Sequence, residues 1–502
     1  MKTHTHRDGR SITASRAWIA FVVLLLCCVN AGTAQAQWEP EMRLTSAPDS
    51  SQSSGSFNAL AVSGDTVHVV WADRRSGDWE IYYKRSVDDG VSWGDDVRIS
   101  TNGKHILAYR PMASIAVSGS KVHVVWHNER TGEYEVYYRR SMDGGSTWDA
   151  EECLYCDVIR SWMPSIAAHG NTVHVAWADF RDGYLSSLYH IRSTDDGHTW
   201  SEARRLSGTA IAGYAQSARI SVTDARVYVS WHYYFGGTWK ASYTLSTDGG
   251  DTWWDENNPA GDPSGTDYLT IQQSYPYIYY LWSEKESSLW NLHYRHSTDA
   301  GLRWQQEGSL RLQQVGYLLY SYAAAGPVLH LAWRDEVNGL GVIRYSCSTD
   351  AGAQWGEFVE ISPFDTGANF PTIARSGSTL HLVWTDYRDG AGEIYYRRNP
   401  TGNPVSVEND DVPLPADIVL EQNYPNPFSG SSSMRFTVPE RSRAILTLHD
   451  PLGRTVATIG DREYEPGTHS ARIDAAALPA GNYLCRLTCG GQMRTRMITV
   501  LR

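Results

Sequence analysis

Four predicted hairpin turns carry an Asp or Asn followed two positions later by an Arg, and this pairing could bind a ligand. The arginines are Arg75, Arg130, Arg181 and Arg388. A guanidinium group offers a planar fork of donors to carboxylates and hydroxyl groups, so an arc of arginines could hold a glycan. The alternative is structural: the acidic residue caps the turn, and the arginine pairs with a glutamate of the returning strand, namely Glu80, Glu135 or Glu393. The regular repetition favours the structural alternative.

The corresponding turn of another repeat, residues 232–239, is rich in aromatic residues instead. Aromatic rings can stack on sugar faces, which makes Tyr233, Tyr234 and Trp239 candidate ligand-binding residues. Ordinary packing within a hairpin is the alternative. His232 in the same stretch leaves open a lyase or another polysaccharide enzyme, although only composition supports that hypothesis.

A Ser-x-Asp-x-Gly-x-x-Trp octet occurs six times and defines the repeat units to which these turns belong. Each octet follows a strand-like run, so it is typical of the turn and exit of a β-hairpin, with Asp accepting backbone hydrogen bonds and Gly supplying positive φ. Near-constant spacing indicates a repeat architecture. The aspartates are Asp88, Asp143, Asp195, Asp248, Asp299 and Asp350.

A second tryptophan ends an apolar strand in every repeat and predicts seven units of four strands each. These residues are Trp71, Trp126, Trp177, Trp231, Trp282, Trp333 and Trp384. Four antiparallel strands per unit are typical of a propeller blade, which must stack on its neighbours in a ring. The seventh unit lacks a fourth strand, and residues 38–45 match residues 93–100 position by position. We therefore expect the N-terminal strand to complete the last blade and close the ring.

Composition bounds the class of protein. The net charge is −12, and no basic stripe offsets it, so nucleic acid is not an expected partner. No P-loop, Rossmann fingerprint or zinc-spaced cluster is found, and no metal or cofactor is predicted. Residues 1–36 have arginines before a short apolar run and small residues at a cleavage position, which predicts a secretory signal and no transmembrane segment once it is removed.

Five cysteines remain after the predicted signal, and the odd count leaves at least one free thiol. Cys153 and Cys156 could form a redox or metal half-site, but no second pair has zinc spacing. A local disulfide, or two unpaired strand residues, is the alternative.

The predicted fold class is all-β: a seven-bladed β-propeller over residues 37–399, a linker over 400–415, and a small immunoglobulin-like β-sandwich over 416–502. The linker has lost the repeat pattern and gained Pro, Asn and Asp. The last segment alternates apolar and polar residues in several short runs, as antiparallel strands do.

The octets resemble the Asp-box, or bacterial neuraminidase repeat, of the sialidase-like β-propeller superfamily. The resemblance implies that the six aspartates are structural residues at the periphery, on the face opposite the ligand site. The tail resembles the C-terminal sorting domain of the type IX secretion system, through residues 420–428, 450–454 and 478–483. It implies the type IX machinery as a partner, and an extracellular or outer-membrane surface location in a Gram-negative bacterium.

The sequence favours a binding or interaction module for glycans or envelope material, and the alternative is an exo-sialidase-type glycoside hydrolase. As the resemblance implies, that chemistry needs three arginines around a carboxylate, an Asp acid/base and a Tyr/Glu pair. Arg110, Arg160 and Arg219 lie near the starts of first strands and could converge, with Asp73 as a candidate acid. The usual Arg-Ile-Pro motif is absent from the first repeat, and short loops leave little material for a deep pocket.

Overall fold

The computed structural model divides into two compact units, Met1–Val407 and Glu408–Arg502. The structure describes residues 38–46, 51–52, 58–101, 112–130, 132–156, 160–183, 185–208, 214–255, 266–274, 276–286, 289–299, 301–314, 318–363, 367–402, 418–420, 423, 426–439, 441–451, 453–464 and 467–501. The predicted signal and most of the predicted linker lie outside these residues. Within them, the structure has no helix both long and apolar enough to cross a membrane.

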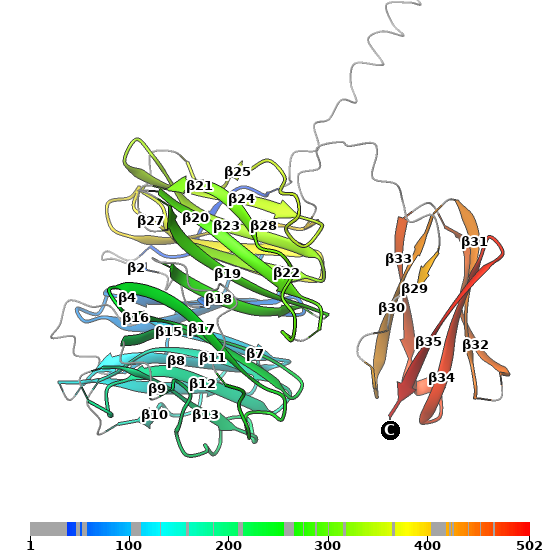
Figure 1. Cartoon of the computed structure of the whole chain (residues 1–502), viewed down its shortest axis with the longest axis horizontal. Helices are drawn as coiled ribbons and strands as arrows, with labels where there is room; N and C mark the ends of the chain where they lie inside the picture. Colours follow the sequence, from blue (N-terminus) through cyan, green and yellow to red (C-terminus); the bar gives the residue numbers. More distant parts are fainter. Residues whose placement is uncertain are drawn as a thin grey trace, which may run out of the picture. The chain divides into compact units, whose positions relative to one another are not determined.

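The first unit is built from antiparallel sheets that follow one another along the chain (Figure 1). The first sheet contains β2 (Ser51–Gln52), β3 (Leu60–Ser63), β4 (Thr66–Asp73), β5 (Glu80–Ser86) and β6 (Val97–Arg98). The second contains β7 (Ala113–Ser118), β8 (Lys121–Glu129), β9 (Tyr134–Ser141) and β10 (Glu152–Tyr155). The third contains β11 (Ser161–His169), β12 (Thr172–Asp179), β13 (Ser187–Ser193) and β14 (Arg204–Arg205).

The following sheets repeat this order. The fourth contains β15 (Tyr214–Thr223), β16 (Arg226–Phe235) and β17 (Thr238–Ser246). The fifth contains β18 (Thr266–Ser274), β19 (Tyr277–Glu286), β20 (Leu289–Ser297) and β21 (Gly308–Gln314). The sixth contains β22 (Tyr320–Ala325), β23 (Val328–Val337), β24 (Leu340–Ser348) and β25 (Val359–Glu360). The seventh contains β26 (Asn369–Ser376), β27 (Thr379–Asp386), β28 (Glu393–Asn399) and β1 (Met42–Arg43).

The N-terminal strand belongs to the last of these sheets. Met42 of β1 lies opposite Tyr396 of β28, just as Val97 of β6 lies opposite Tyr83 of β5. The first strands of successive sheets also contact one another, and β26 contacts β3. The pairing of β1 covers an edge of β28 that would otherwise expose unpaired backbone groups.

The core of the first unit lies between neighbouring sheets. The seven repeated tryptophans lie within the second strands, which continue beyond them rather than ending there as predicted. All seven are buried, with Trp71, Trp126, Trp177, Trp231, Trp282 and Trp384 fully so. Apolar residues on both faces of the inner strands bury against the adjacent sheets, which explains the near-continuous apolar runs of β4, β8 and β12. Burial on both faces makes each sheet depend on its neighbours for stability.

The second unit is a pair of antiparallel sheets around one apolar core. One sheet contains β29 (Val419–Leu420), β30 (Ser431–Val438) and β33 (Gly467–Asp474). The other contains β32 (Thr455–Tyr464), β31 (Ser442–His449), β34 (Gly481–Cys489) and β35 (Gln492–Val500), and a short 3₁₀ turn, η1 (Ala475–Ala477), follows β33.

Cys153 and Cys156 form a disulfide at the end of β10, so the local-disulfide alternative is confirmed. Cys347, Cys485 and Cys489 are free and buried. Burial raises the pKa of the Cys347 and Cys485 thiols to about 12, so these thiols are protonated near neutral pH.

Candidate functional site

An aromatic pocket of about 740 Å³ lies between the third and fourth sheets. Five aromatic side chains line it together with two charged residues, a glutamine and a glycine. The lining residues are Glu133, Arg160, Trp162, Phe180, Gly183, Tyr214, Gln216, Tyr234 and Trp239. This volume falls in the range of small-ligand sites, which combine apolar walls with a few polar groups. We refer to these nine residues as the aromatic pocket.

The aromatic pocket lies at the sheet ends opposite the octets. Its residues come from the starts of β11 and β15, from the β12–β13 and β16–β17 turns, and from the β8–β9 connection. The octets join third to fourth strands and lie beside the turns between first and second strands, as the bond from the Gly144 amide to the Ser120 carbonyl illustrates (2.6 Å). Alternate turns of an antiparallel sheet lie at opposite ends, so the octets and the aromatic pocket lie at different ends of these sheets.

Two β-bulges shape the wall of the aromatic pocket. The register of β11 against β12 shifts between Trp162 and Ser165, and that of β15 against β16 shifts between Gln216 and Arg219. Met163 and Ser217 have positive φ angles of 53° and 56° inside these shifts. An extra residue in one strand bends it and changes the direction of the neighbouring side chains. The bulges therefore fix where Trp162 and Gln216 enter the pocket.

Two aromatic contacts organise the rings. Tyr234 and Trp239 face each other across the β16–β17 hairpin, with centroids 5.3 Å apart and planes at 64°. Trp162 and Phe180 lie 6.0 Å apart on the opposite wall. Tyr214 and Tyr234 are 44% and 40% exposed, unusual for tyrosines that a fold uses only for packing. Rings held in place and open to solvent can receive a ligand face without rearrangement.

Tyr233 and His232 support this wall from behind and do not line the pocket. Tyr233 packs against the apolar core of the fourth sheet. His232 is buried and contacts Trp239 edge to face at 4.9 Å. Burial, with a smaller contribution from Arg219, lowers the pKa of His232 to about 3. The neutral imidazole packs as an aromatic ring beneath Trp239.

Arg160 and Glu133 supply the charged groups of the aromatic pocket. Nε of Arg160 lies 3.3 Å from Oε2 of Glu133, and the two side chains are 56% and 44% exposed. Arg160 has a φ of 57°, and its carbonyl accepts a hydrogen bond from the Phe180 amide at 3.2 Å. The backbone of Arg160 is thus tied to the β12–β13 turn while its side chain reaches solvent.

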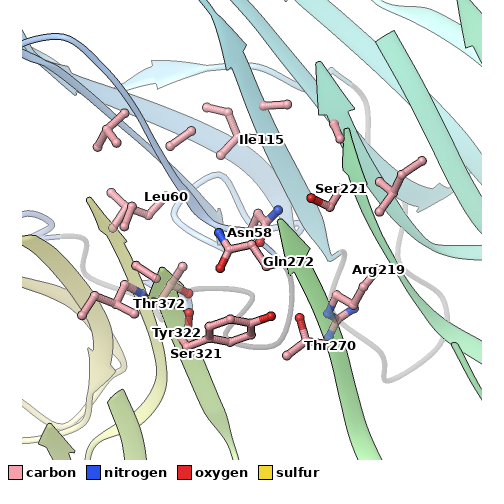
Figure 2. A pocket seen from close by; sticks show the side chains of 18 of the residues that line it. Asn58, Leu60, Ile115, Arg219, Ser221, Thr270, Gln272, Ser321, Tyr322 and Thr372 are labelled. Atoms are coloured by element: carbon pink, nitrogen blue, oxygen red, sulfur yellow. Dashed lines mark hydrogen bonds between the residues drawn. The ribbon is translucent and has the colours of Figure 1, made fainter. Parts of the chain in front are cut away.

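A second cavity of about 350 Å³ follows the inner strands of all the sheets of the first unit. Its polar lining includes Asn58, Arg219, Thr270, Gln272 and Tyr322, which approach one another from different sheets in Figure 2. Arg219 is 7% exposed and donates to the Ala218 carbonyl at 2.9 Å. The Tyr322 hydroxyl donates to the Tyr279 carbonyl at 3.1 Å. Arg219 and Tyr322 thus donate to backbone carbonyls, so we rank this cavity below the aromatic pocket as a ligand site.

The predicted catalytic arginines are not gathered at one place among the residues that the structure describes. Arg160 lines the aromatic pocket, Arg219 lines the second cavity, and Arg110 falls outside the described residues. Asp73 is fully buried and accepts bonds from Ser51, Trp71 and Arg75 at 2.8, 2.9 and 2.6 Å. Although burial alone would raise the pKa of Asp73, these bonds hold it below its usual value.

The four repeated arginines lie over tyrosine rings of their own sheets and are paired with acids. Arg75 pairs with Asp73 and Asp96, each at 2.6 Å, and lies 4.5 Å from the Tyr82 centroid. Arg388 pairs with Asp386 at 2.6 Å and with Glu41, and lies 4.2 Å from the Tyr395 centroid. Arg130 pairs with Glu151, and Arg181 with Asp179 at 2.6 Å.

These partners differ from the predicted Glu80, Glu135 and Glu393. Glu80 and Glu393 bind arginines of the fourth strands, Arg98 and Arg43, and Glu135 accepts from the Tyr137 hydroxyl at 2.6 Å. Arg75, Arg130 and Arg388 instead pair with acids that lie three positions after the last tryptophan of an octet or after the equivalent Trp38. That spacing, Trp38 to Glu41, Trp93 to Asp96 and Trp148 to Glu151, is a sequence signal that could have identified the pairs.

The octet aspartates are engaged within their own turns. In the second octet the Ser141 hydroxyl donates to Asp143 at 2.8 Å, and the Thr147 amide and hydroxyl donate to it at 2.8 and 2.6 Å. The same Ser-to-Asp bond occurs in the other five octets. Bonds from Ser92 and Ser86 lower the pKa of Asp88 to about 2, so this carboxylate is an acceptor and a poor proton donor.

Two contacts were not singled out from the sequence. Tyr137 and Glu135 form a buried Tyr/Glu pair, but burial and the carboxylate raise the pKa of the phenol. His293 lies 2.9 Å from Glu307. None of the four lines either cavity. Within the part of the chain that the structure describes, no three His, Cys, Asp or Glu side chains are grouped to hold a metal ion.

Comparison with solved structures relates the fold of the first unit to known folds. An ulvan lyase, solved with a -[GlcA(1-4)Rha3S]- chain, superposes with a TM-score of 0.53 and 10% identity over 71% of this chain and 95% of its own. The polysaccharide lyase Uly1 matches at 0.49 with 11% identity over 72% and 99%. A Trypanosoma rangeli sialidase matches at 0.42 with 10% identity over 80% and 86%. The first unit shares its fold with the ulvan lyase.

The second unit is identified by its sequence. Residues 422–500 match the family described as the secretion system C-terminal sorting domain. The protein is thus exported by the type IX secretion system, to the extracellular space or the cell surface of a Gram-negative bacterium. No curated protein matches the chain.

Proposed function

We propose that the protein is an exported binding module whose ligand is a glycan, held in the aromatic pocket. The observation that carries this proposal is the convergence of Trp162, Phe180, Tyr214, Tyr234 and Trp239 on one pocket. The rings offer flat apolar surfaces to the C–H faces of sugars, and Arg160, Glu133 and Gln216 offer donors and acceptors to hydroxyl groups. Of the predicted ligand-binding residues, Tyr234 and Trp239 belong to this proposal. Tyr233 supports them.

We infer further that the seven sheets are the blades of a closed propeller, with β1 as the last strand of the last blade. The pairing of β1 with β28 supports this arrangement. So does the contact of β26 with β3, because it joins the last first strand to the first one. A closed ring would hold the third and fourth sheets at a fixed separation. That fixed separation is what a preformed pocket between them requires.

The proposal is for binding and does not include turnover. As the resemblance to sialidases implies, an exo-sialidase needs arginines that converge on one carboxylate. Arg160 and Arg219 line separate cavities, and Arg160 is paired with Glu133. Binding needs only the surface that the aromatic pocket already presents.

The test is a binding assay on a panel of soluble polysaccharides, by retardation in affinity gels, with the full chain and a Trp239→Ala variant. Loss of one stacking ring is expected to weaken binding about ten-fold, near 1.4 kcal/mol. The matched control is Trp254→Ala: this tryptophan is 43% exposed and follows an octet at the opposite sheet ends. If both variants bind as the unmodified protein does, the aromatic pocket is not the glycan site.

A further inference from the structure

The charged groups of the aromatic pocket cancel each other. Arg160 is the cation and Glu133 the anion among its lining residues, and they face each other at 3.3 Å. The remaining polar side chains, those of Gln216 and the tyrosines, are uncharged. A carboxylate or sulfate on a ligand would therefore meet a guanidinium that already has a carboxylate beside it.

Two arginines near the aromatic pocket are engaged by acids of their own, and Lys240, next to Trp239, lies 5.8 Å from the centroid of the Phe235 ring. Arg181 follows Phe180 in the chain, but it is paired with Asp179 at 2.6 Å and lies between the rings of Tyr155 and Tyr189, each at 3.8 Å. Arg205 pairs with Asp182 at 3.2 Å. The protein as a whole carries a net charge of −12.

Neutral sugars suit this arrangement better than acidic ones. A hydroxyl group can donate to Glu133 and accept from Arg160 at once, which makes use of the pair without separating it. An anionic group that approached Arg160 would have to displace Glu133 or lie against it, and like charges at close range repel. The five aromatic rings contribute equally to either class of sugar, so the charged pair decides between them.

We infer that the aromatic pocket selects neutral glycans and discriminates against chains that carry carboxylate or sulfate groups. This inference rests on the proposed function, because it names the ligand class of the same site. Glu133 is then a specificity-determining residue: it contributes hydrogen bonds to a neutral ligand and excludes an anionic one.

The experiment compares the full chain with a Glu133→Gln variant on two sets of soluble polysaccharides. The neutral set holds mixed-linkage β-glucan, xylan, glucomannan and galactan, and the acidic set holds polygalacturonate, alginate and chondroitin sulfate. Affinity is measured by gel retardation and by titration of tryptophan fluorescence. Glu336→Gln is the matched control, because Glu336 pairs with Arg334 at 3.3 Å on a hairpin of the sixth sheet and does not line the aromatic pocket.

The expected result is retardation by at least one neutral polysaccharide and by none of the acidic ones, with the neutral affinity lowered roughly ten-fold in Glu133→Gln and unchanged in Glu336→Gln. Stronger binding to an acidic chain, increased further by Glu133→Gln, would overturn the inference and leave the proposed function standing. Binding to no polysaccharide of either set would overturn the proposed function, and the inference with it.

Discussion

Trp93 packs edge-on against Tyr396, with ring centroids 5.0 Å apart and planes at 76°, although one belongs to the first octet and the other to the last sheet of the first unit. The same contact joins Trp148 to Tyr83 and Trp200 to Tyr138. Trp38, which precedes β1, packs on Tyr345 in the same way at 5.2 Å. The tryptophan that ends each octet, and Trp38 at the equivalent position before β1, thus packs on the sheet that precedes its own.

This geometry predicts energetic coupling between the two ends of the first unit. In a double-mutant cycle of Trp93→Ala and Tyr396→Ala, the coupling free energy of unfolding is expected to be about 1 kcal/mol, because edge-to-face rings stabilise each other beyond simple burial. The measurement is chemical denaturation of the four proteins. The control cycle combines Trp93→Ala with Tyr83→Ala, since Tyr83 packs on Trp148. Additivity in both cycles would argue against a closed ring.

The octet glycines predict a second effect on stability. A Cβ atom on Gly145 would lie 2.0 Å from the Tyr83 hydroxyl, and the φ of Gly145 is +84°. Gly119 also has a positive φ, +62°, but a Cβ there meets nothing within 4 Å. Gly119→Ala is expected to cost about 1–2 kcal/mol from the backbone alone, and Gly145→Ala clearly more. Thermal unfolding of both variants gives the comparison, and equal losses would remove any role for the contact with Tyr83.

The strand register of the repeats could be predicted from the sequence because the repeated tryptophans align the units with one another. Aligning Trp38 with Trp93 makes Met42 equivalent to Val97, and the two residues pair with the equivalent tyrosines, Tyr396 and Tyr83. The same alignment relates Glu41 to Asp96, and both pair with arginines of the repeated turns. A one-residue error would have placed these acids on the other face of the strand.

The aromatic pocket could not be predicted as a whole, for a physical reason. Trp162, Phe180 and Tyr214 were not among the candidates, whereas Arg160, Tyr234 and Trp239 were. The positions of Trp162 and Gln216 depend on bulges at Met163 and Ser217, residues whose types do not require positive φ. The pocket also depends on the spacing of two sheets, which no local pattern encodes.

Buried histidines predict a loss of stability in acid. His123 is fully buried and lies 2.7 Å from the Tyr138 hydroxyl. Burial is the main cause that lowers its pKa to about 4 from the ordinary value of 6.5; Arg140 and Lys121 also lower it, and Asp196 raises it. Between these values the unfolded chain binds more protons than the folded one, so stability is full above pH 6.5 and falls as the pH drops towards 4.

The measurement is the free energy of unfolding from pH 7 to pH 4. His123→Asn is expected to flatten the slope by up to one proton, because the buried imidazole no longer resists protonation. Tyr138→Phe is the control: it removes the hydrogen bond and keeps the histidine, so it lowers stability at every pH and retains the slope. An unchanged slope in His123→Asn would assign the acid sensitivity to other groups.

Arg388 and Arg160 predict opposite effects on stability and binding. Arg388 is 19% exposed, binds the fully buried Asp386 and joins it to Glu41 beside β1. Arg388→Ala leaves Asp386 without this partner and removes the contact with the Tyr395 ring, so stability should fall by about 2–4 kcal/mol. Glycan affinity should be unchanged.

Arg160→Ala should lower glycan affinity and leave stability unchanged, because Arg160 is 56% exposed and its side chain pairs only loosely with Glu133. Denaturation and gel retardation on both variants separate the two roles. Should Arg388→Ala lose glycan binding at normal stability, the repeated arginines would form the ligand site and the aromatic pocket would not.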